Sequence, residues 1–117
     1  MPAADYKRPE SVLVMVYTSA GDVLLMERRQ PADYWQSVTG SLAWGETVQA
    51  AAARELEEET GLVAGECLID CGYENTFEIL PAWRDRYAPD VQTNTEHVFR
   101  VEYTDRPPVR INLGELR

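Results

Sequence analysis

The chain has 117 residues, enough for one domain and too few for two. Hydrophobic residues make up 44% and charged residues 26%, which predicts a packed core under a solvated surface and excludes a disordered chain. The formal net charge of −9 repels nucleic-acid backbones and acidic membranes, so we expect neither as a partner. Residues 1–9 lack an apolar run and the longest apolar stretch is short, so we expect a cytoplasmic protein without a signal peptide or membrane span.

The first third of the chain alternates apolar runs with turn residues. Residues 11–18 are a β-branched and aliphatic run typical of a buried strand. Residues 23–26 resume the pattern after a Ser-Ala-Gly-Asp turn, which indicates a hairpin. A loop around Pro31 then leads to a short predicted strand over residues 35–39.

Residues 48–60 predict the one helix that local sequence defines clearly. They are rich in Ala, Glu, Arg and Leu, which are strong helix formers. Thr47 has a side chain suited to cap the first turn, and Gly61 stands where a helix-ending glycine belongs.

The last part of the chain predicts further strands. The expected elements are a long or broken strand over 67–79, a loop over 81–90, a strand over 95–103 and a final strand over 109–113. Together these elements predict one domain over residues 1–117, with a mixed sheet and at least one helix packed on it, in the α/β or α+β class.

The two cysteines and the single histidine are expected to be structural. A zinc site needs four ligands, and Cys67, Cys71 and His97 reach that number only with an added carboxylate. The spacing of the cysteines in an extended segment does not suit a disulfide, so we expect two buried, reduced thiols.

Three glutamates of the predicted helix are candidate metal ligands. Glu58 and Glu59 follow Glu55 by three and four positions, so at about 100° per residue all three share one helix face. Like charges at these spacings repel, and the negative end of the helix dipole adds to the cost. A hard divalent cation such as Mg²⁺ offsets that repulsion, because it prefers carboxylate oxygens.

An isolated run of glutamates is more often a solvated helix face, and that alternative stays open from the three residues alone. The surrounding residues favour a site. Gly40, Gly45 and Glu46 precede the helix, and Arg54 is its one cation. Arg54 is placed to pair with Glu46 or a neighbouring carboxylate and to orient it.

The residues from Gly40 to Leu62 resemble the Nudix box. That pattern is G, five residues, E, seven residues, R-E, an aliphatic, any residue, E-E, any residue, G, an aliphatic. Every fixed position is matched, by Gly40, Glu46, the Arg54-Glu55 pair, the Glu58-Glu59 pair and Gly61 among others. The resemblance implies an α/β/α sandwich in which the box forms a loop, a helix and a loop.

The same resemblance implies roles for individual residues. Glu55, Glu58 and Glu59 would bind Mg²⁺ or Mn²⁺, and Glu58 or Glu59 would activate water. Glu46 and Arg54 would hold the loop against the helix, and Thr39 would offer backbone groups beside the metal or the phosphates.

Segments outside the box are similar to the bacterial dihydroneopterin triphosphate pyrophosphatases, a branch of this family. The matching segments are Tyr6-Lys7-Arg8-Pro9, Trp35 to Ser41, Arg86-Tyr87-Ala88-Pro89 and Asn94-Thr95-Glu96. By this resemblance Lys7, Arg28 and Arg29 would contact the triphosphate, and Glu115 would complete the metal site. Trp35 would stack on a pterin or base ring or else lie in the core.

The resemblance predicts a pyrophosphohydrolase that acts on a small-molecule triphosphate, as a monomer or a homodimer. Dihydroneopterin triphosphate is the first expected substrate, and dATP or an oxidised nucleotide is the alternative. A Nudix-fold module that binds nucleotides without catalysis is the alternative from another class. The relatives usually continue into a further segment and helix, which we expect this chain to lack beyond Arg117.

Overall fold

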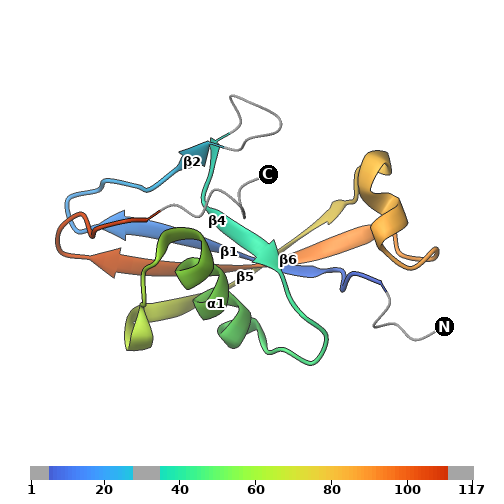
Figure 1. Cartoon of the computed structure of the whole chain (residues 1–117), viewed down its shortest axis with the longest axis horizontal. Helices are drawn as coiled ribbons and strands as arrows, with labels where there is room; N and C mark the ends of the chain where they lie inside the picture. Colours follow the sequence, from blue (N-terminus) through green and yellow to red (C-terminus); the bar gives the residue numbers. More distant parts are fainter. Residues whose placement is uncertain (1–5, 28–34, 111–117) are drawn as a thin grey trace.

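The computed structural model describes residues 6–27 and 35–110 (Figure 1). Three residues expected in the site, Arg28, Arg29 and Glu115, lie outside these ranges. Among the described residues, no helix combines the length and the apolar character needed to cross a membrane.

The centre of the molecule is a mixed four-stranded sheet in the order β4-β1-β6-β5. Its strands are β1 (Glu10–Thr18), β4 (Val38–Ser41), β5 (Leu68–Glu78) and β6 (Thr93–Tyr103). Strand β1 runs parallel to β6 and antiparallel to β4, while β5 runs antiparallel to β6. The predicted mixed sheet is therefore confirmed.

The predicted hairpin after β1 is shorter than expected. Tyr17 and Val23 form an isolated antiparallel bridge, and the following segment pairs only as β2 (Met26–Glu27) with β3 (Trp35–Gln36). Val23 and Leu25 are about half exposed, so this apolar run does not reach the core along its whole length.

Helix α1 (Val48–Thr60) has the predicted bounds and both predicted caps. The Thr47 Oγ1 accepts a hydrogen bond from the Ala50 amide at 3.1 Å. Gly61 adopts a left-handed φ of 77°, and its amide donates to the Glu57 carbonyl at 2.8 Å. A non-glycine residue would be strained in that conformation, which is why the helix ends there.

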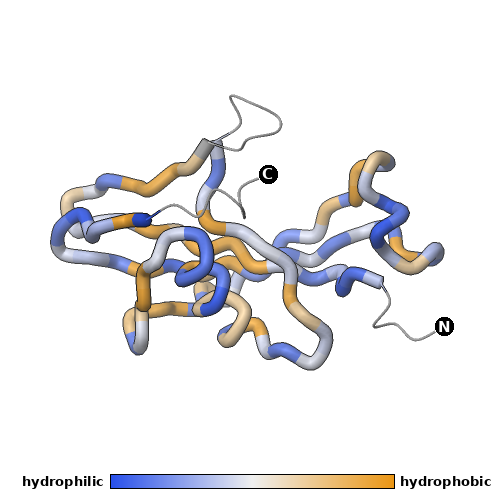
Figure 2. Tube along the Cα trace, viewed as in Figure 1, coloured by the Kyte–Doolittle hydropathy of each residue, from blue (hydrophilic) through white to orange (hydrophobic). Residues whose placement is uncertain are grey.

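The core lies between α1 and one face of the sheet. The buried residues of β1 are Val12, Val14 and Val16, at alternate positions, as expected for a strand with one covered face. Phe99 and Val101 of β6 join them, and the helix contributes Ala51, Ala52 and Leu56. The small alanines bring the helix backbone close to the sheet. Figure 2 shows the apolar stretches running through these central strands.

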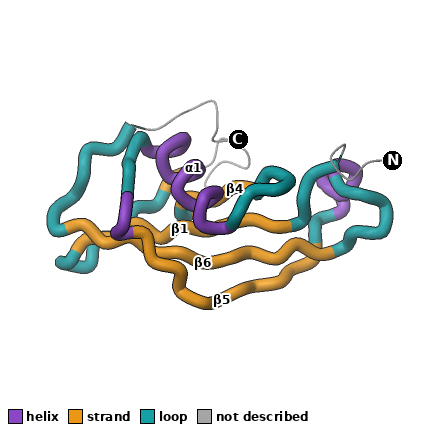
Figure 3. Tube along the Cα trace, turned by 90° about the horizontal axis from the view of Figure 1, so that it is seen from below, coloured by secondary structure: helices purple, strands orange, loops and turns teal. Residues whose placement is uncertain are grey.

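Helix α1 is the one α-helix of the described ranges, and it covers one side of the sheet (Figure 3). Strand β5 forms the edge, and almost all its residues after Leu68 are exposed. Cys67 and Cys71 are free thiols as predicted, but the expectation that they are buried was wrong: Cys71 is exposed on this edge strand, and Cys67 is exposed at the end of the short 3₁₀ helix just before it.

Two short 3₁₀ helices complete the fold. They are η2 (Gly65–Cys67) and η3 (Pro81–Arg86), the latter inside the segment expected to be a loop. Residues 109–110 are not in a strand, and the rest of the predicted final strand falls outside the described residues.

Candidate metal and phosphate site

Arg54 is the centre of the candidate site. It projects from the middle of α1 and donates to both carboxylate oxygens of Glu46, from Nε to Oε2 at 2.8 Å and from Nη2 to Oε1 at 2.9 Å. Its Nη2 also donates to the Ser41 carbonyl at the end of β4, at 3.0 Å. The hydrogen bond with Glu46 is the main cause that raises the pKa of Arg54. This arginine therefore joins the helix, the loop before it and the sheet.

The same guanidinium contacts two glutamates of its own helix. Its Nη1 lies 2.8 Å from Glu55 Oε2 and 3.1 Å from Glu58 Oε2. A single cationic nitrogen thus lies between two carboxylates that would otherwise repel each other.

Glu46 folds the loop that precedes α1 onto itself. Its Oε1 accepts a hydrogen bond from the Ala43 amide at 2.9 Å, and its own amide donates to the Ala43 carbonyl at 3.1 Å. The hydrogen bond from Arg54 is the main cause that holds the pKa of Glu46 below its ordinary value. Glu46 is therefore ionised at neutral pH, and hydrogen bonds hold both its backbone amide and its carboxylate.

Glu55 and Glu59 are the buried pair of the site. They are 7% and 3% exposed, and their carboxyl groups are hydrogen-bonded to each other. Burial is the main cause that raises the pKa of Glu55, against the opposing hydrogen bonds with Glu59 and Arg54. Burial therefore disfavours the charged form of Glu55, although Arg54 lies beside it.

Gly40 provides the space in which Glu55 lies. It stands on β4 opposite Val12 of β1, and a Cβ built on it would overlap the Glu55 carboxyl group. The first glycine of the box is therefore required by close approach of a side chain rather than by an unusual backbone conformation.

Glu58 differs from the other two glutamates of the cluster. Its side chain is 40% exposed and turns to Arg54. Within residues 6–27 and 35–110, no three histidine, cysteine, aspartate or glutamate residues form a ready metal site. The donor chemistry nevertheless fits a hard divalent cation, because two glutamate carboxyl groups lie buried beside each other and a cation would offset the cost of burying their charge.

The structure describes three further predicted site residues, Lys7, Thr39 and Trp35. Lys7 lies near Tyr87, with its Nζ 5.8 Å from the ring centroid. Thr39, beside Gly40 on β4, donates from Oγ1 to the Val12 carbonyl at 3.0 Å. Trp35 is 57% exposed, so of its two alternatives the core is excluded.

Arg8 belongs to the matching segment at residues 6–9, but no role was predicted for it. Its Nη1 donates to the carbonyls of Ala43 and Glu46 at 3.0 and 2.8 Å, across the loop that carries Glu46. A charged residue just before the first apolar strand was the available signal, but a single arginine there gives no indication of its target.

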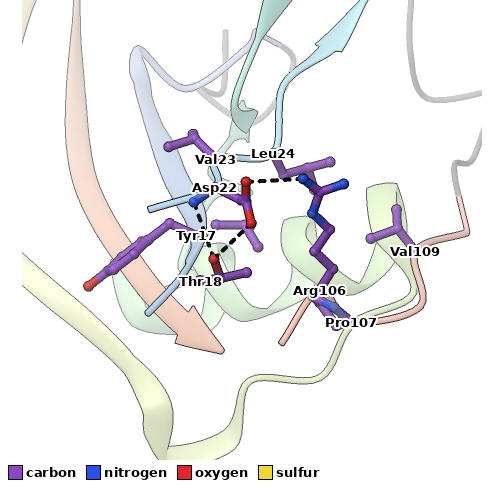
Figure 4. A pocket seen from close by; sticks show the side chains of 9 residues that line it. Tyr17, Thr18, Asp22, Val23, Leu24, Arg106, Pro107 and Val109 are labelled. Carbon is purple, nitrogen blue, oxygen red and sulfur yellow. Dashed lines mark hydrogen bonds and ion pairs between the residues drawn. The ribbon is translucent and has the colours of Figure 1, made fainter. Parts of the chain in front are cut away.

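A separate cavity of about 310 Å³ lies at the end of β1 (Figure 4). Its lining includes Val16, Thr18, Asp22, Leu24, Arg106 and Val109. Asp22 and Arg106 form an ion pair at 3.0 Å, and the hydrogen bond from Arg106 chiefly holds the pKa of Asp22 below its ordinary value. None of the predicted site residues that the structure describes lines this cavity.

Comparison with known proteins places these features in a family. Residues 7–116 match the NUDIX domain model. The chain is 49% identical over 98 residues to the dihydroneopterin triphosphate diphosphatase of Escherichia coli K12, an alignment that covers 80% of this chain and 65% of that protein. It is 43% identical over 101 residues to the enzyme of the same name from Haemophilus influenzae, covering 83% and 64%. The chain therefore spans just under two thirds of the length of these relatives.

Solved structures agree with the sequence comparison. The structure of the E. coli dihydroneopterin triphosphate pyrophosphohydrolase superposes with a TM-score of 0.82 at 41% identity, covering 92% of this chain and 76% of that one. A protein from Methanosarcina mazei shares the fold with a TM-score of 0.66 at 19% identity, covering 97% and 74%. The expected mixed sheet with its loop-helix-loop segment is confirmed, and the chain belongs to the Nudix family.

Proposed function

We propose that this chain hydrolyses dihydroneopterin triphosphate and releases pyrophosphate. The observation that carries the proposal is its 49% identity to the E. coli dihydroneopterin triphosphate diphosphatase. The complete box and the buried Glu55–Glu59 pair support it, because they keep the carboxylates that phosphate hydrolysis requires. The non-catalytic alternative is disfavoured for the same reason.

Nudix hydrolases generally use a divalent metal ion. We propose Mg²⁺, or Mn²⁺ in its place, held by Glu55, Glu58 and Glu59, with Glu115 as a further ligand. When bound, such an ion polarises phosphoryl oxygens and neutralises the leaving group. The burial of Glu55 and Glu59 supports this assignment. Two negative charges are costly to bury without a cation, and a bound divalent ion would offset that cost.

We propose the remaining roles on the resemblance to the family, and the contacts of Arg54 and Glu46 support theirs. Glu59 or Glu58 would accept the proton of the attacking water. Arg54 and Glu46 would keep the loop and helix in one arrangement. Lys7, Arg28 and Arg29 would bind the phosphates of the substrate.

The ring of the substrate needs a contact of its own. Trp35 is exposed beside β4, which supports its proposed role of stacking on a pterin or base. Thr39 would contribute backbone groups near the phosphates, since it precedes Gly40 on β4.

A panel of substrates tests the proposal. Purified protein with Mg²⁺ is assayed for pyrophosphate release from dihydroneopterin triphosphate, dATP, an oxidised deoxynucleoside triphosphate and a 5′-triphosphate RNA. We expect the highest kcat/KM on dihydroneopterin triphosphate. A higher value on dATP or the oxidised nucleotide would favour the nucleotide-pool function, and binding without products would favour the non-catalytic module. Glu59→Gln serves as the inactive control, and the oligomeric state is measured on the same sample.

A further inference from the structure

The N-terminal segment, residues 6–10, lies against the loop that precedes α1. The Trp44 indole Nε1 donates to the Tyr6 carbonyl at 2.6 Å, and the Leu42 amide donates to the Glu10 carbonyl at 3.0 Å. These contacts join positions about 35 residues apart in sequence. The loop is therefore held from outside the box as well as by Glu46 within it.

Arg8 makes the contacts of this segment that reach farthest along the loop. Its Nη1 donates to the carbonyls of Ala43 and Glu46, the same two residues whose backbone and side chain close the loop on themselves. Charge-assisted hydrogen bonds of this kind are among the stronger ones in proteins. One arginine nitrogen therefore fixes both sides of the turn.

The guanidinium of Arg8 is itself fixed. Its Nε and Nη2 lie 2.8 and 2.7 Å from Glu10 Oε1, and its side chain is only 19% exposed. Glu10 Oε2 is in turn 3.0 Å from His97 Nε2, on the neighbouring strand. The Nε and Nη2 of Arg8 thus bind the sheet through Glu10, while its Nη1 binds the loop.

Glu46 connects this arrangement to the buried carboxylates. Its carbonyl accepts from Arg8, while its side chain accepts from Arg54, which contacts Glu55 and Glu58. A shift of the Glu46 backbone therefore moves the group that aligns Arg54.

We propose that Arg8 is a positioning residue for the hydrolysis, acting through the loop and the Glu46–Arg54 pair rather than by contact with the substrate. This inference rests on the proposed function for its catalytic consequence. Its structural part concerns the loop and metal binding, and can be measured separately. Lysine at position 8 keeps the charge, but a single ammonium cannot serve Glu10 and both loop carbonyls with the geometry of a guanidinium.

The test compares Arg8→Lys and Arg8→Ala with Arg100→Ala as the matched control. Arg100 is exposed and donates to the Tyr17 hydroxyl at 2.7 Å. It lies next to buried Phe99 on β6 and so points to the face of the sheet away from α1. The control removes one positive charge and one hydrogen bond without touching the loop.

Three measurements are made on each variant. Hydrogen exchange of the Ala43 and Glu46 amides reports the loop, calorimetric titration with Mg²⁺ reports the carboxylates, and kcat and KM on dihydroneopterin triphosphate report the reaction. For Arg8→Lys we expect faster exchange at these two amides, weaker Mg²⁺ binding by about tenfold and a kcat lower by about 10- to 100-fold. We expect KM to change by less than about threefold, because the lost interaction is not with the substrate. Arg100→Ala should match wild type in all three.

The failures are distinguishable. If wild type shows no turnover on the panel, the proposed function fails, and exchange and Mg²⁺ affinity still decide the positioning role. Unchanged exchange with unchanged Mg²⁺ affinity in both Arg8 variants overturns the inference. So does a loss expressed in KM alone, which would mean that Arg8 binds substrate. If Arg8→Ala fails to fold, Arg8→Lys carries the test, with melting temperature as the check.

Discussion

Arg54 and Glu46 face each other as two parallel forks, with Nε donating to Oε2 at 2.8 Å and Nη2 donating to Oε1 at 2.9 Å. Their positions are eight residues apart, one on α1 and the other in the preceding loop. This geometry needs a planar guanidinium, because an ammonium is a point charge and cannot match both oxygens in the same way. The pair therefore fixes the direction in which the loop enters the helix.

Arg54→Lys is expected to lower both stability and activity while keeping the charge. Loss of the second hydrogen bond and of the Ser41 contact should cost about 1–2 kcal/mol, a fall in Tm of roughly 5–10 °C. The kcat should fall by about 10- to 100-fold, as for other residues that orient metal ligands. Arg106→Lys, at the exposed pair with Asp22, is the matched control and should retain Tm and kcat. Equal behaviour of the two variants would show that the fork geometry does not matter.

Gly40→Ala is expected to lower activity strongly by adding a single methyl group. The added Cβ overlaps the Glu55 carboxyl group, so Glu55 must leave its position or the strand must shift, at a cost of about 1–3 kcal/mol. Activity and Mg²⁺ affinity should each fall at least about tenfold, because Glu55 can no longer lie beside Glu59.

The control for Gly40→Ala is Gly72→Ala, in the irregular part of β5. Gly72 has a φ of 68° and open space around it, so alanine there costs about 1–2 kcal/mol of backbone strain without touching the site. Both variants should therefore melt earlier than wild type, and only Gly40→Ala should lose turnover. Full activity in Gly40→Ala would contradict the placement of Glu55.

Glu59→Gln separates the site from the fold. An amide keeps the size of the side chain and can still hydrogen-bond Glu55, so stability without metal should stay within about 1 kcal/mol of wild type. The kcat should fall by about 10²–10⁴-fold if Glu59 accepts the proton of water.

Metal removal gives a second readout for the same variant. Mg²⁺ at 100 times its Kd should stabilise wild type by about 2.7 kcal/mol, and EDTA should reverse the shift in Tm. Glu59→Gln should show little of this shift. A full Mg²⁺-induced shift in the variant would mean that Glu59 is not a ligand.

The sequence predicted the helix better than the strands around it. The helix had its cap at Thr47, its stop at Gly61 and a run of strong helix formers between them, all of which act within a few residues. The segment after β1 was predicted as a strand from its apolar residues, but its pairing depends on partners elsewhere, and only Met26–Glu27 forms a ladder. The exposure of Cys71 could not be predicted from its local sequence either, since it depends on which strand forms the edge of the sheet.

The candidate site, too, could be predicted only as far as its local sequence determines it. The periodicity of α1 placed Glu55, Glu58 and Glu59 on one face, and the structure brings Glu55 and Glu59 into contact. Glu58 is joined to Glu55 through Arg54, whose Nη1 contacts both carboxylates. The contact of Arg8 with the loop could not be read from sequence, since it joins residues 35 and 38 positions apart.

The last prediction concerns Glu10 and acid stability. The hydrogen bond with His97 is the main cause that holds the pKa of Glu10 below its ordinary value of 4.5, Arg8 acts in the same direction, and partial burial opposes both. A carboxyl group with a lowered pKa in the folded state stabilises the fold at pH values above 4.5, and this contribution is lost as the pH falls through the folded pKa. The free energy of unfolding of wild type should therefore exceed that of Glu10→Gln near pH 7, and the difference should shrink as the pH falls below 4.5 and through the folded pKa of Glu10. Urea unfolding of both proteins from pH 3 to pH 7 measures it. The same pair of variants in a His97→Gln background lacks the hydrogen bond that lowers the pKa of Glu10 most, so a smaller difference with a shallower loss towards acid pH is expected there, while Arg8 still acts. A difference that is independent of pH would show that Glu10 acts through packing and not through its charge.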